Sequence, residues 1–308
     1  MSTSSIQAPA AVVMIRPHHF RVNPETAGDN VYQQDTVAMD QTKLARLAFQ
    51  ELTVAAKLLE EAGIRVHIFE DEGTDTPDSV FPNNWFSTHS GGHIALYPMF
   101  SEARRKERRP DVINMLKSSY RVQDVIDYSG LEPDGLFLEG TGAMVLDHID
   151  RVAYAVKSNR TDPIALERFC THFNYEPMVF EAEDENGVPV YHTNVLMCIA
   201  TSFVMISLDM IKNLQRRNEI VKRFEASGRT VIDLSPSQIA DFAGNAIELH
   251  GAEQNILALS SRALAALTTE QINIIEQSVN ILGLDIPSIE LAGGSVRCTL
   301  AGIHLTPR

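Results

Sequence analysis

The sequence is poor in cysteine. Its three cysteines, Cys170, Cys198 and Cys298, lie far apart among 308 residues, so we expect no disulfides and a reducing, cytoplasmic setting. No spacing of cysteine and histidine fits a zinc site, and no glycine-rich loop between a strand and a helix fits a phosphate cradle. The sequence therefore predicts neither a metal nor an organic cofactor.

Long apolar runs and an excess of basic residues are also missing. No apolar run reaches the roughly 18 residues that a membrane span needs. The first ten residues carry neither the basic segment nor the apolar core of a signal peptide. The net charge is −14, and basic residues cluster only over 104–109, which argues against nucleic acid as the main partner. We therefore expect neither a membrane nor a nucleic-acid partner.

One unit of helix, strand and hairpin recurs along the chain. Residues 1 to about 9 are rich in serine, threonine and alanine and are expected to be frayed. Hydrophobic spacing and turn residues predict helices over 38–61, 102–117 with a break at Pro110, 163–173, 209–226 and 268–281. Strands are expected over 11–15, 64–69, 85–88, 93–97, 120–126, 143–146, 152–156, 175–180, 195–200, 203–208, 230–234, 246–249, 255–259, 284–289 and 300–305.

This pattern contains five helices but only four complete hairpins. The last strand, 300–305, completes the fifth hairpin if it pairs with the first strand, 11–15. Pairing of the first strand with the last removes open edges in a radial fold. The sequence therefore predicts an α/β fold of one domain over 1–308, a five-bladed pseudo-symmetric ββαβ propeller closed by its first and last strands. An ordinary three-layer α/β sheet is the alternative.

A loop precedes each expected hairpin, and a radial fold brings equivalent loops to one end of its axis. The loops are 78–85, 138–142, 191–194, 242–245 and 293–298. Together they offer the thiol of Cys298, the imidazole of His192, the carboxylates of Asp78 and Glu139, and several side-chain amides. Each of these signals has a structural alternative when it stands alone, because loop histidines and asparagines commonly bind backbone groups in turns.

Cys298 closes the last of these loops, after Gly293 and Gly294. The glycines permit a sharp turn, and both Arg297 and the first turn of a short helix favour a thiolate. A thiolate nucleophile needs an acid/base partner, for which His192 is the candidate. A small buried cysteine after a glycine turn is the alternative, and Cys170 and Cys198 are expected in the core.

In their order along the chain, the five loops resemble those of the guanidine-modifying (pentein) superfamily, which includes arginine deiminase, dimethylargininase and the amidinotransferases. Within it, the sequence is most similar to the citrulline-utilisation hydrolases; the segments that carry this likeness are 14–17, 20, 23, 25–26, 81–85, 242–245 and 293–298. The resemblance implies the ββαβ propeller, Cys298 as the nucleophile, His192 as the acid and base, and Glu139 as the residue that orients His192 or the substrate.

Three positions depart from the superfamily pattern. Asn84 and Asn194 stand where guanidine-binding relatives carry aspartate, and Gly142 replaces the last aspartate of a Glu-Gly-Gly-Asp motif. A guanidinium has only donors and requires acceptors, whereas an amide side chain satisfies both the carbonyl and the N–H groups of a neutral ureido group. The exchanges therefore favour a ureido substrate such as citrulline, although Glu139 keeps a guanidine substrate open.

Further substrate contacts follow from the resemblance. Arg160 is expected to bind the α-carboxylate, and Arg104 is a second candidate, for which a solvated residue of a charged helix is the favoured alternative. Asp78 is expected at the substrate amine. The remaining expected contacts are Asn245 from the fourth loop and Phe20 and Asn23 from the N-terminal loop.

These observations predict a cysteine-dependent hydrolase of a ureido or guanidino C–N bond in a small amino acid. Its expected reaction converts citrulline into ornithine, carbon dioxide and ammonia. The alternatives are arginine deiminase or dimethylargininase activity, an amidinotransferase, and a non-catalytic propeller that binds a small molecule. The sequence leaves open whether the protein is a homo-oligomer and whether a loop closes over the site.

Overall fold

The computed structural model describes residues 7–28, 30–36 and 38–308. Within these residues the strands form five separate three-stranded sheets, and no sheet closes on itself. The strands are β1 (Ala11–Pro17), β2 (Arg65–Asp71), β3 (Phe86–His89), β4 (His93–Leu96), β5 (Asp124–Asp127), β6 (Met144–Asp147), β7 (Val152–Val156), β8 (Glu176–Phe180), β9 (Met197–Ile199), β10 (Phe203–Ile206), β11 (Thr230–Asp233), β12 (Ile247–His250), β13 (Asn255–Ser260), β14 (Asn280–Leu284) and β15 (Ala301–Gly302).

Helices connect these strands. The longer ones are α1 (Gln41–Glu61), α3 (Pro110–Ser119), α5 (Pro163–Phe173), α7 (Leu214–Ala226) and α10 (Thr269–Ile275). The shorter ones are α2 (Glu102–Arg105), α4 (Gly140–Ala143), α6 (Thr193–Leu196), α8 (Pro236–Ala240), α9 (Ser261–Ala266), α11 (Pro287–Glu290) and α12 (Val296–Thr299), with 3-10 turns η1 (Pro24–Thr26), η2 (Pro82–Asn84) and η3 (Ser129–Asp134).

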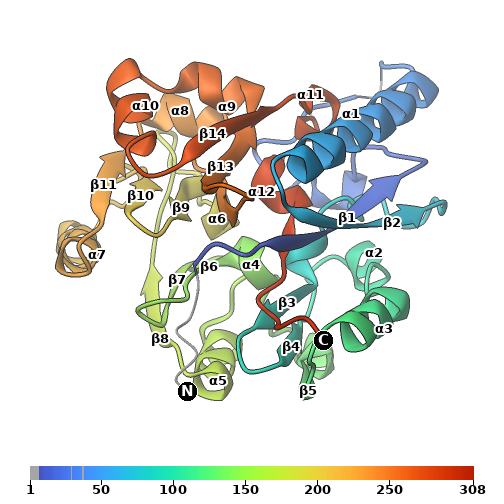
Figure 1. Cartoon of the computed structure of the whole chain (residues 1–308), viewed down its shortest axis with the longest axis horizontal. Helices are drawn as coiled ribbons and strands as arrows, with labels where there is room; N and C mark the ends of the chain where they lie inside the picture. The colour runs from blue at the N-terminus through green and yellow to red at the C-terminus, as the bar shows by residue number, and fades with distance from the viewer. Residues whose placement is uncertain (1–6, 29, 37) are drawn as a thin grey trace.

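All five sheets have the same plan. In four of them a short hairpin gives the antiparallel pair, and the chain then crosses over through a helix and adds a parallel third strand, as in β3, β4 and β5; in the remaining sheet β15 and β1 form the antiparallel pair. A parallel neighbour needs such a crossover, which explains the alternation of hairpin and helix in the sequence. In Figure 1 the sheets lie around the middle of the molecule, where the short helices α4, α6 and α12 are found.

The first and last strands belong to one sheet, as the sequence predicted. β15 pairs antiparallel with β1, with Val12 opposite Gly302, and β1 pairs in parallel with β2. The expected last strand over 300–305 is reduced to Ala301–Gly302. The chain turns away from the sheet at His304, because the backbone N–H of His304 donates to the hydroxyl oxygen of Thr88. The N-terminal and C-terminal segments therefore share one sheet.

Several element boundaries differ from the predicted ones for local reasons. Capping by Asp40 starts α1 at Gln41 rather than 38, and capping by Asn213 starts α7 at Leu214 rather than 209. The break at Pro110 is confirmed, since Pro110 begins α3. The expected strand 195–200 is shortened by the helical turn α6, and the expected strand 120–126 shifts to Asp124–Asp127.

The prediction for residues 268–289 is wrong in its division between helix and strand. The helix α10 ends at Ile275, and Asn280–Leu284 forms β14 in parallel with β13. The expected strand over 284–289 contains the turn α11 instead, which begins with Pro287. Isoleucine and leucine recur throughout this stretch, and an apolar run of this kind does not distinguish a helix from a strand.

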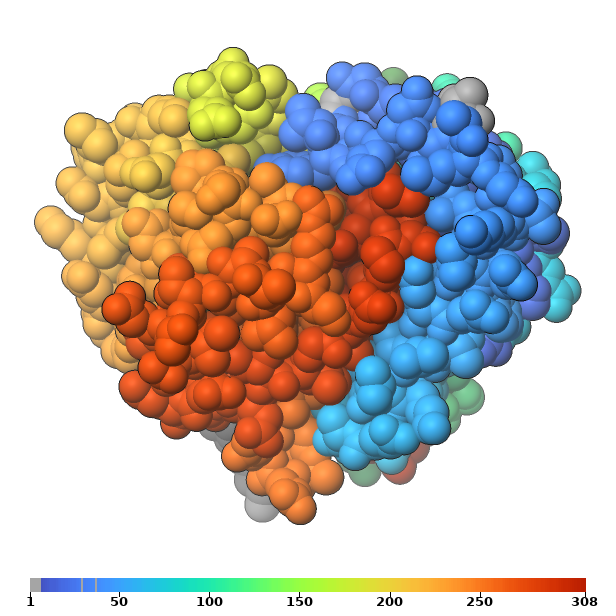
Figure 2. Space-filling view, turned by 90° about the horizontal axis from the view of Figure 1, so that it is seen from above, coloured from blue at the N-terminus to red at the C-terminus, as the bar shows by residue number. Residues whose placement is uncertain are grey.

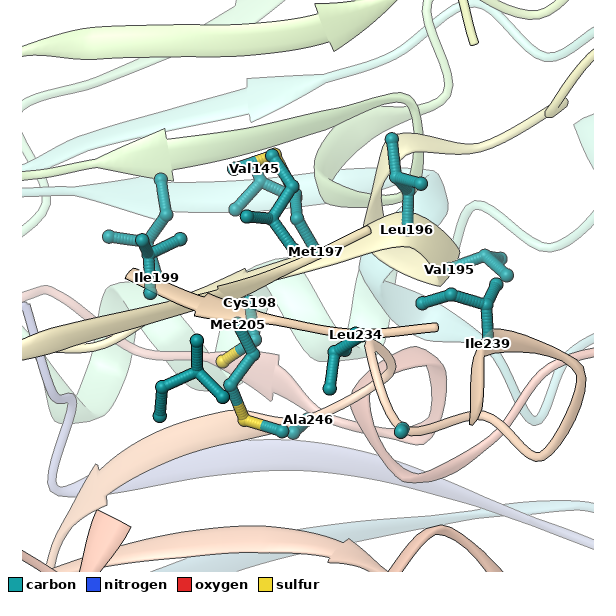
Figure 3. Close-up of a cluster of buried hydrophobic side chains, with 14 of the residues drawn as sticks. Val145, Val195, Leu196, Met197, Cys198, Ile199, Met205, Leu234, Ile239 and Ala246 are labelled. Atoms are coloured by element: carbon teal, nitrogen blue, oxygen red, sulfur yellow. The ribbon is translucent and has the colours of Figure 1, made fainter. Parts of the chain in front are cut away.

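The core is packed between the sheets and their helices. Figure 3 shows one cluster in which the side chain of Cys198 on β9 points toward Met205 and Ala246, and Cys198 is 3% exposed. Cys170 on α5 is also buried, in the cluster around Phe169. The prediction that both cysteines belong to the core is confirmed.

The start of the described chain is bound to the rest of the molecule. Of the residues expected to be frayed, 1–6 lie outside the described residues, but Gln7 is buried and bonded at both ends of its amide. Its Nε2 donates to the carbonyls of Leu146 and Ile199 at 3.0 Å each, and its Oε1 accepts from the backbone of His148 at 2.9 Å. The expectation of fraying is therefore wrong for Gln7. Across the described residues, the helices include none long and apolar enough to cross a membrane.

Candidate active site

The loops that precede the hairpins meet in the middle of the molecule (Figure 1). Four of them contain a helical turn, in η2, α4, α6 and α12. Their close approach depends on glycine at position 142, where a Cβ would overlap the Asn84 amide and lie 2.9 Å from Nδ1 of His192. The departure from aspartate at position 142 is thus a packing requirement, since a side chain there would collide with two neighbouring loops.

Two side-chain amides hold the sulfur of Cys298. Nδ2 of Asn194 and Nδ2 of Asn245 each donate to Sγ at 3.2 Å. Asn245 is fixed in turn, because the same Nδ2 also donates to the carbonyl of Asn194 at 2.9 Å. Cys298 is 3% exposed and lies on α12, as expected. The two amides therefore fix the position of the sulfur.

His192 and Glu139 form a buried pair. Nε2 of His192 lies 2.8 Å from Oε2 of Glu139, whose side chain is fully buried. Burial lowers the pKa of His192 to about 4, although the hydrogen bond and the charge of Glu139 oppose this shift. The imidazole is therefore neutral at neutral pH. Because the ionised carboxylate can only accept, the proton of the ring lies on Nε2 and Nδ1 carries the free lone pair.

Two arginines share the same carboxylate. Nη1 of Arg160 lies 3.4 Å and Nη1 of Arg104 lies 3.6 Å from Oε2 of Glu139. Burial alone would raise the pKa of Glu139, but the charge of Arg160, the hydrogen bond from His192 and the charge of Arg104 hold it well below its usual range. Oε1 of Glu139 accepts the backbone N–H of Phe100 at 3.0 Å. Glu139 is therefore an ionised anchor for the histidine and the two arginines.

Arg104 is buried at the centre of a second ionic network. It is 2% exposed, so the interpretation as a solvated surface residue is wrong. Its Nε donates to Glu107 at 3.0 Å and lies 3.7 Å from Oδ2 of Asp78. The neighbouring groups determine the orientation of the Asn84 amide: its Oδ1 faces Arg104 and accepts from both terminal nitrogens of that residue, at 2.9 and 3.1 Å. The sequence concealed this burial because Arg104 stands in a charged stretch.

These groups line a small pocket. Its walls are Thr26, Asn30, Asp78, Phe81, Asn84, Arg104, Arg160, Tyr191, His192, Ala292, Gly294 and Cys298. The pocket leaves about 20 Å³ for the centre of a water-sized sphere, which is room for about one water molecule. An amino acid therefore needs a wider opening than this conformation provides. On the face shown in Figure 2, red residues near the C-terminus lie between the blue N-terminal segment and the orange segment that precedes them in the chain. Nδ2 of Asn30 in the N-terminal segment donates to the carbonyl of Ala292 at 3.1 Å.

The structure brings most of the expected site residues together. Glu139, Asn194 and Asn245 lie behind the pocket wall, and Asn23 donates to Oδ2 of Asp78 at 2.8 Å. Phe20 does not line the pocket; it is 1% exposed and packs in the core cluster that contains Phe81. An aromatic ring flanked by Val80 and Phe81 gains more from complete burial than from covering a polar site.

Two important residues were not predicted. Tyr191 lines the pocket, and its hydroxyl donates to the carbonyl of Gly293 at 2.7 Å. Its position directly before His192 in a loop was the available signal. Glu107 carries the main salt bridge to Arg104, and burial raises its pKa to about 8 against the opposing charge of Arg104. Its spacing of three residues from Arg104 on a helix was the corresponding signal.

Solved structures of this fold include several enzymes. The N-terminal domain of ArgZ, an arginine dihydrolase from Cyanobacteria, is 16% identical, with a TM-score of 0.73 over 95% of this chain and 97% of that chain. AgrE is 17% identical, with a TM-score of 0.72 over 97% of this chain and 40% of its own. A dimethylarginine dimethylaminohydrolase is 13% identical, with a TM-score of 0.61 over 95% and 98%. No curated protein matches the sequence.

A protein-family model gives the more specific result. Residues 16–305 match the model described as N,N dimethylarginine dimethylhydrolase, eukaryotic. This match covers all five loops and every residue assigned to the pocket. Together with the shared fold, it confirms the expected superfamily and the expectation of an enzyme that hydrolyses C–N bonds. The chain belongs to the eukaryotic N,N-dimethylarginine dimethylhydrolase family of the guanidine-modifying superfamily.

Proposed function

We propose that the protein hydrolyses citrulline to ornithine, carbon dioxide and ammonia through a covalent intermediate on Cys298. The observation that carries the proposal is the pairing of the carboxylates around the pocket. Glu139 is bound by His192, Arg160 and Arg104, and Asp78 is bound by Asn23 and lies next to Arg104. A guanidinium would have to compete with these partners, whereas a neutral ureido group adds no charge.

The two asparagines support a neutral head group. Asn84 offers its amide at the pocket wall. Oδ1 of Asn194 is buried beside Cys298 and has no hydrogen-bond partner among the described residues. A buried acceptor without a partner costs stability, and an N–H of the substrate would satisfy it. A ureido group supplies such N–H donors together with a carbonyl oxygen for the donors of the site.

In the first chemical step, the thiolate of Cys298 attacks the ureido carbon. The C–N bond to the δ-nitrogen of ornithine then breaks, and the departing nitrogen takes a proton from His192. Cys298 is left as a carbamoyl thioester. Nδ1 of His192 is the basic nitrogen of the resting enzyme, so it first accepts the thiol proton of Cys298, which forms the thiolate, and then donates that proton to the departing nitrogen.

In the second step, His192 takes a proton from water, which attacks the thioester carbonyl. The C–S bond breaks, the sulfur of Cys298 leaves as a thiolate and takes back the proton held by His192, and the released carbamic acid decomposes to carbon dioxide and ammonia. Glu139 stabilises the imidazolium form of His192 in both steps through the 2.8 Å contact. Asn194 and Asn245 stabilise the thiolate that enters and leaves the cycle.

Arg160 and Asp78 are the proposed contacts for the α-carboxylate and the α-amino group. Both line the pocket, and their charges are opposite to those of the two groups. Thr26 and Asn30 of the N-terminal loop also line it, so we propose that this loop shifts to admit the substrate. We further propose that the five sheets form one domain around a common axis with this site at one end. The three free cysteines support a reducing compartment such as the cytoplasm.

Hydrolysis of arginine or of methylated arginine is the second candidate. The family match favours it, because the family is named for dimethylarginine. In addition, structures of AgrE and of the N-terminal domain of ArgZ, which have the same fold, are described as bound to L-arginine and to substrate, respectively. The same cysteine and histidine would act on the central guanidino carbon.

Comparison of kcat/KM on citrulline, arginine and asymmetric dimethylarginine tests the proposal. Purified protein is offered each substrate separately, and ornithine, citrulline, dimethylamine and ammonia are measured. A higher kcat/KM on citrulline, with ornithine as the product, supports the proposal. A higher value on either guanidine substrate shows instead that the paired carboxylates Glu139 and Asp78 still accommodate a cation.

A further inference from the structure

A second cavity lies behind α12, and none of its lining residues lines the active pocket. It is bounded by one strand of each of the five sheets, through Phe86 to Thr88 of β3, Val145 and Leu146 of β6, Met197 to Ile199 of β9, Ile247 and Glu248 of β12, and Ala301 and Gly302 of β15. About 50 Å³ is available to the centre of a water-sized sphere. The cavity therefore has room for a few waters or a small ion.

Arg297 brings a positive charge into this cavity. Consecutive residues of a helical turn point in different directions, so Cys298 lines the active pocket while Arg297 lines the cavity behind it. Nη1 of Arg297 donates to the carbonyl of Leu300 at 2.8 Å. Among the described residues, Arg297 forms no ion pair within 4.0 Å. Burial lowers the pKa of Arg297.

The three fully buried arginines, Arg104, Arg160 and Arg229, are paired with carboxylates. Arg104 lies 3.0 Å from Glu107, and Arg160 lies 3.4 Å from Glu139. Arg229 lies 2.8 Å from a carboxylate oxygen of Asp147. Interior guanidinium groups are normally matched by such an acceptor, because an unpaired charge in a medium of low dielectric constant is costly. Arg297 is partly exposed, at the edge of the cavity, and forms no such pair within the described chain.

The carboxylate that borders the cavity is already occupied. Oε2 of Glu248 accepts from both the backbone N–H and the hydroxyl of Thr201 at 2.7 Å, and its Oε1 accepts from Asn255 at 2.9 Å. The outer side of the cavity is lined by Gln7, which the backbone of two sheets holds in place. A ligand for Arg297 must therefore be small and must carry its own negative charge.

We propose that this cavity is a binding site for a small inorganic anion, of chloride to bicarbonate size, held by the guanidinium of Arg297. The anion supplies the missing counter-charge, and the N–H groups of the guanidinium that remain free supply its hydrogen bonds. The site lies on the opposite side of α12 from the thiol of Cys298. It is independent of the substrate identity proposed above.

Chloride is the probe for the test. Thermal unfolding is measured over a series of sodium chloride concentrations, with ionic strength held constant by sodium gluconate, whose anion is too large for the cavity. At chloride concentrations a hundred times the dissociation constant, we expect the Tm of the wild type to have risen by about 5 °C and to keep rising with the logarithm of the chloride concentration. Arg297→Met should abolish the rise, whereas Arg121→Met, a surface variant, should keep it.

An equal rise in the wild type and in Arg297→Met would overturn the proposal, as would no rise in the wild type. If Arg297→Met does not fold, crystals of the wild type soaked in sodium bromide give a second measurement. An anomalous peak within hydrogen-bond distance of the Arg297 guanidinium supports the site. A cavity without a bromide peak contradicts it and indicates that water alone solvates the arginine.

Discussion

At the scale of single residues, specificity depends on which groups in the pocket, and directly behind its wall, are free to meet a substrate. The acidic groups are bound to arginines, asparagine or histidine, while one amide oxygen, that of Asn194, lacks a partner in the described region. Specificity then follows from hydrogen bonding to a neutral group rather than from ion pairing. Asn84 is the best position at which to change this substrate specificity by substitution, because its amide lies at the pocket wall and contacts Arg104.

Asn84→Asp should shift the substrate preference toward arginine. Arg104 engages one oxygen of the new carboxylate, but the second oxygen replaces the amide N–H, so it gives a guanidinium an acceptor of opposite charge and deprives a ureido group of one donor. We expect the ratio of kcat/KM on arginine to that on citrulline to rise by about tenfold, which corresponds to about 1.4 kcal/mol. Asn186→Asp, which adds the same charge in an exposed turn, should leave the ratio unchanged. An unchanged ratio in Asn84→Asp would remove Asn84 from the selection of substrate.

The pH dependence of kcat/KM should report the low pKa of His192. The neutral imidazole is the active base, so activity is present above the pKa and is lost as the pH falls through it. With that pKa lowered to about 4 by burial, the rate should stay level between pH 7 and about 5 and decline near pH 4. Circular dichroism over the same range separates titration from unfolding. A decline centred near 6.5, the ordinary value for histidine, would contradict the assignment of His192 as a buried neutral base.

At the scale of secondary-structure elements, capping decides where helices begin. Asp162 caps α5, and its side chain accepts from the backbone of both Ile164 and Ala165. The sequence placed this helix correctly at 163–173, since Pro163 at its first position and Asn174 after its last residue mark both ends. Over 268–289 a capping box of Thr268 and Gln271 marks the start of α10, but no glycine or asparagine marks its end at Ile275, so the division between helix and strand was missed.

Asp162→Ala should lower the free energy of unfolding by about 1 kcal/mol, because two N–H groups lose their acceptor. Asp162→Asn is the matched variant, since its amide oxygen can still accept, and it should lose less than half as much. Urea denaturation of the three proteins gives the values. Equal losses in both variants would show that the charge of Asp162, rather than its hydrogen bonds, stabilises α5.

The five loops show how far the sequence specifies the site. Their order and polar residues were enough to place Cys298, His192, Glu139 and the asparagines around one pocket. The partners within the pocket were not predictable, because they depend on side-chain directions between loops that are distant in sequence. Phe20 was expected to contact the substrate but is a core residue. Arg104 was expected at the surface but is buried in the ionic network.

At the scale of the whole molecule, separate sheets must be held to one another by contacts outside their ladders. Gln7 supplies one such contact, with three hydrogen bonds to the backbone beside β6 and in β9. Gln7→Ala should therefore lower the free energy of unfolding by about 1–3 kcal/mol, because buried carbonyl and N–H groups lose their partner. Gln254→Ala, at an exposed position, is the control and should change little. A loss no larger than that of the control would mean that the first described residues do not join the sheets.

The central claim is that Cys298 carries the carbamoyl group of citrulline during turnover. Rapid acid quenching of the enzyme with citrulline, followed by mass spectrometry of the peptide that contains Cys298, tests this claim most directly. The account predicts a carbamoyl group on Cys298 in the wild type, together with ornithine in solution, and neither product with Cys298→Ser. Ornithine formation from citrulline by Cys298→Ser, or a wild-type enzyme that modifies Cys298 only with the amidino group of arginine, would contradict it.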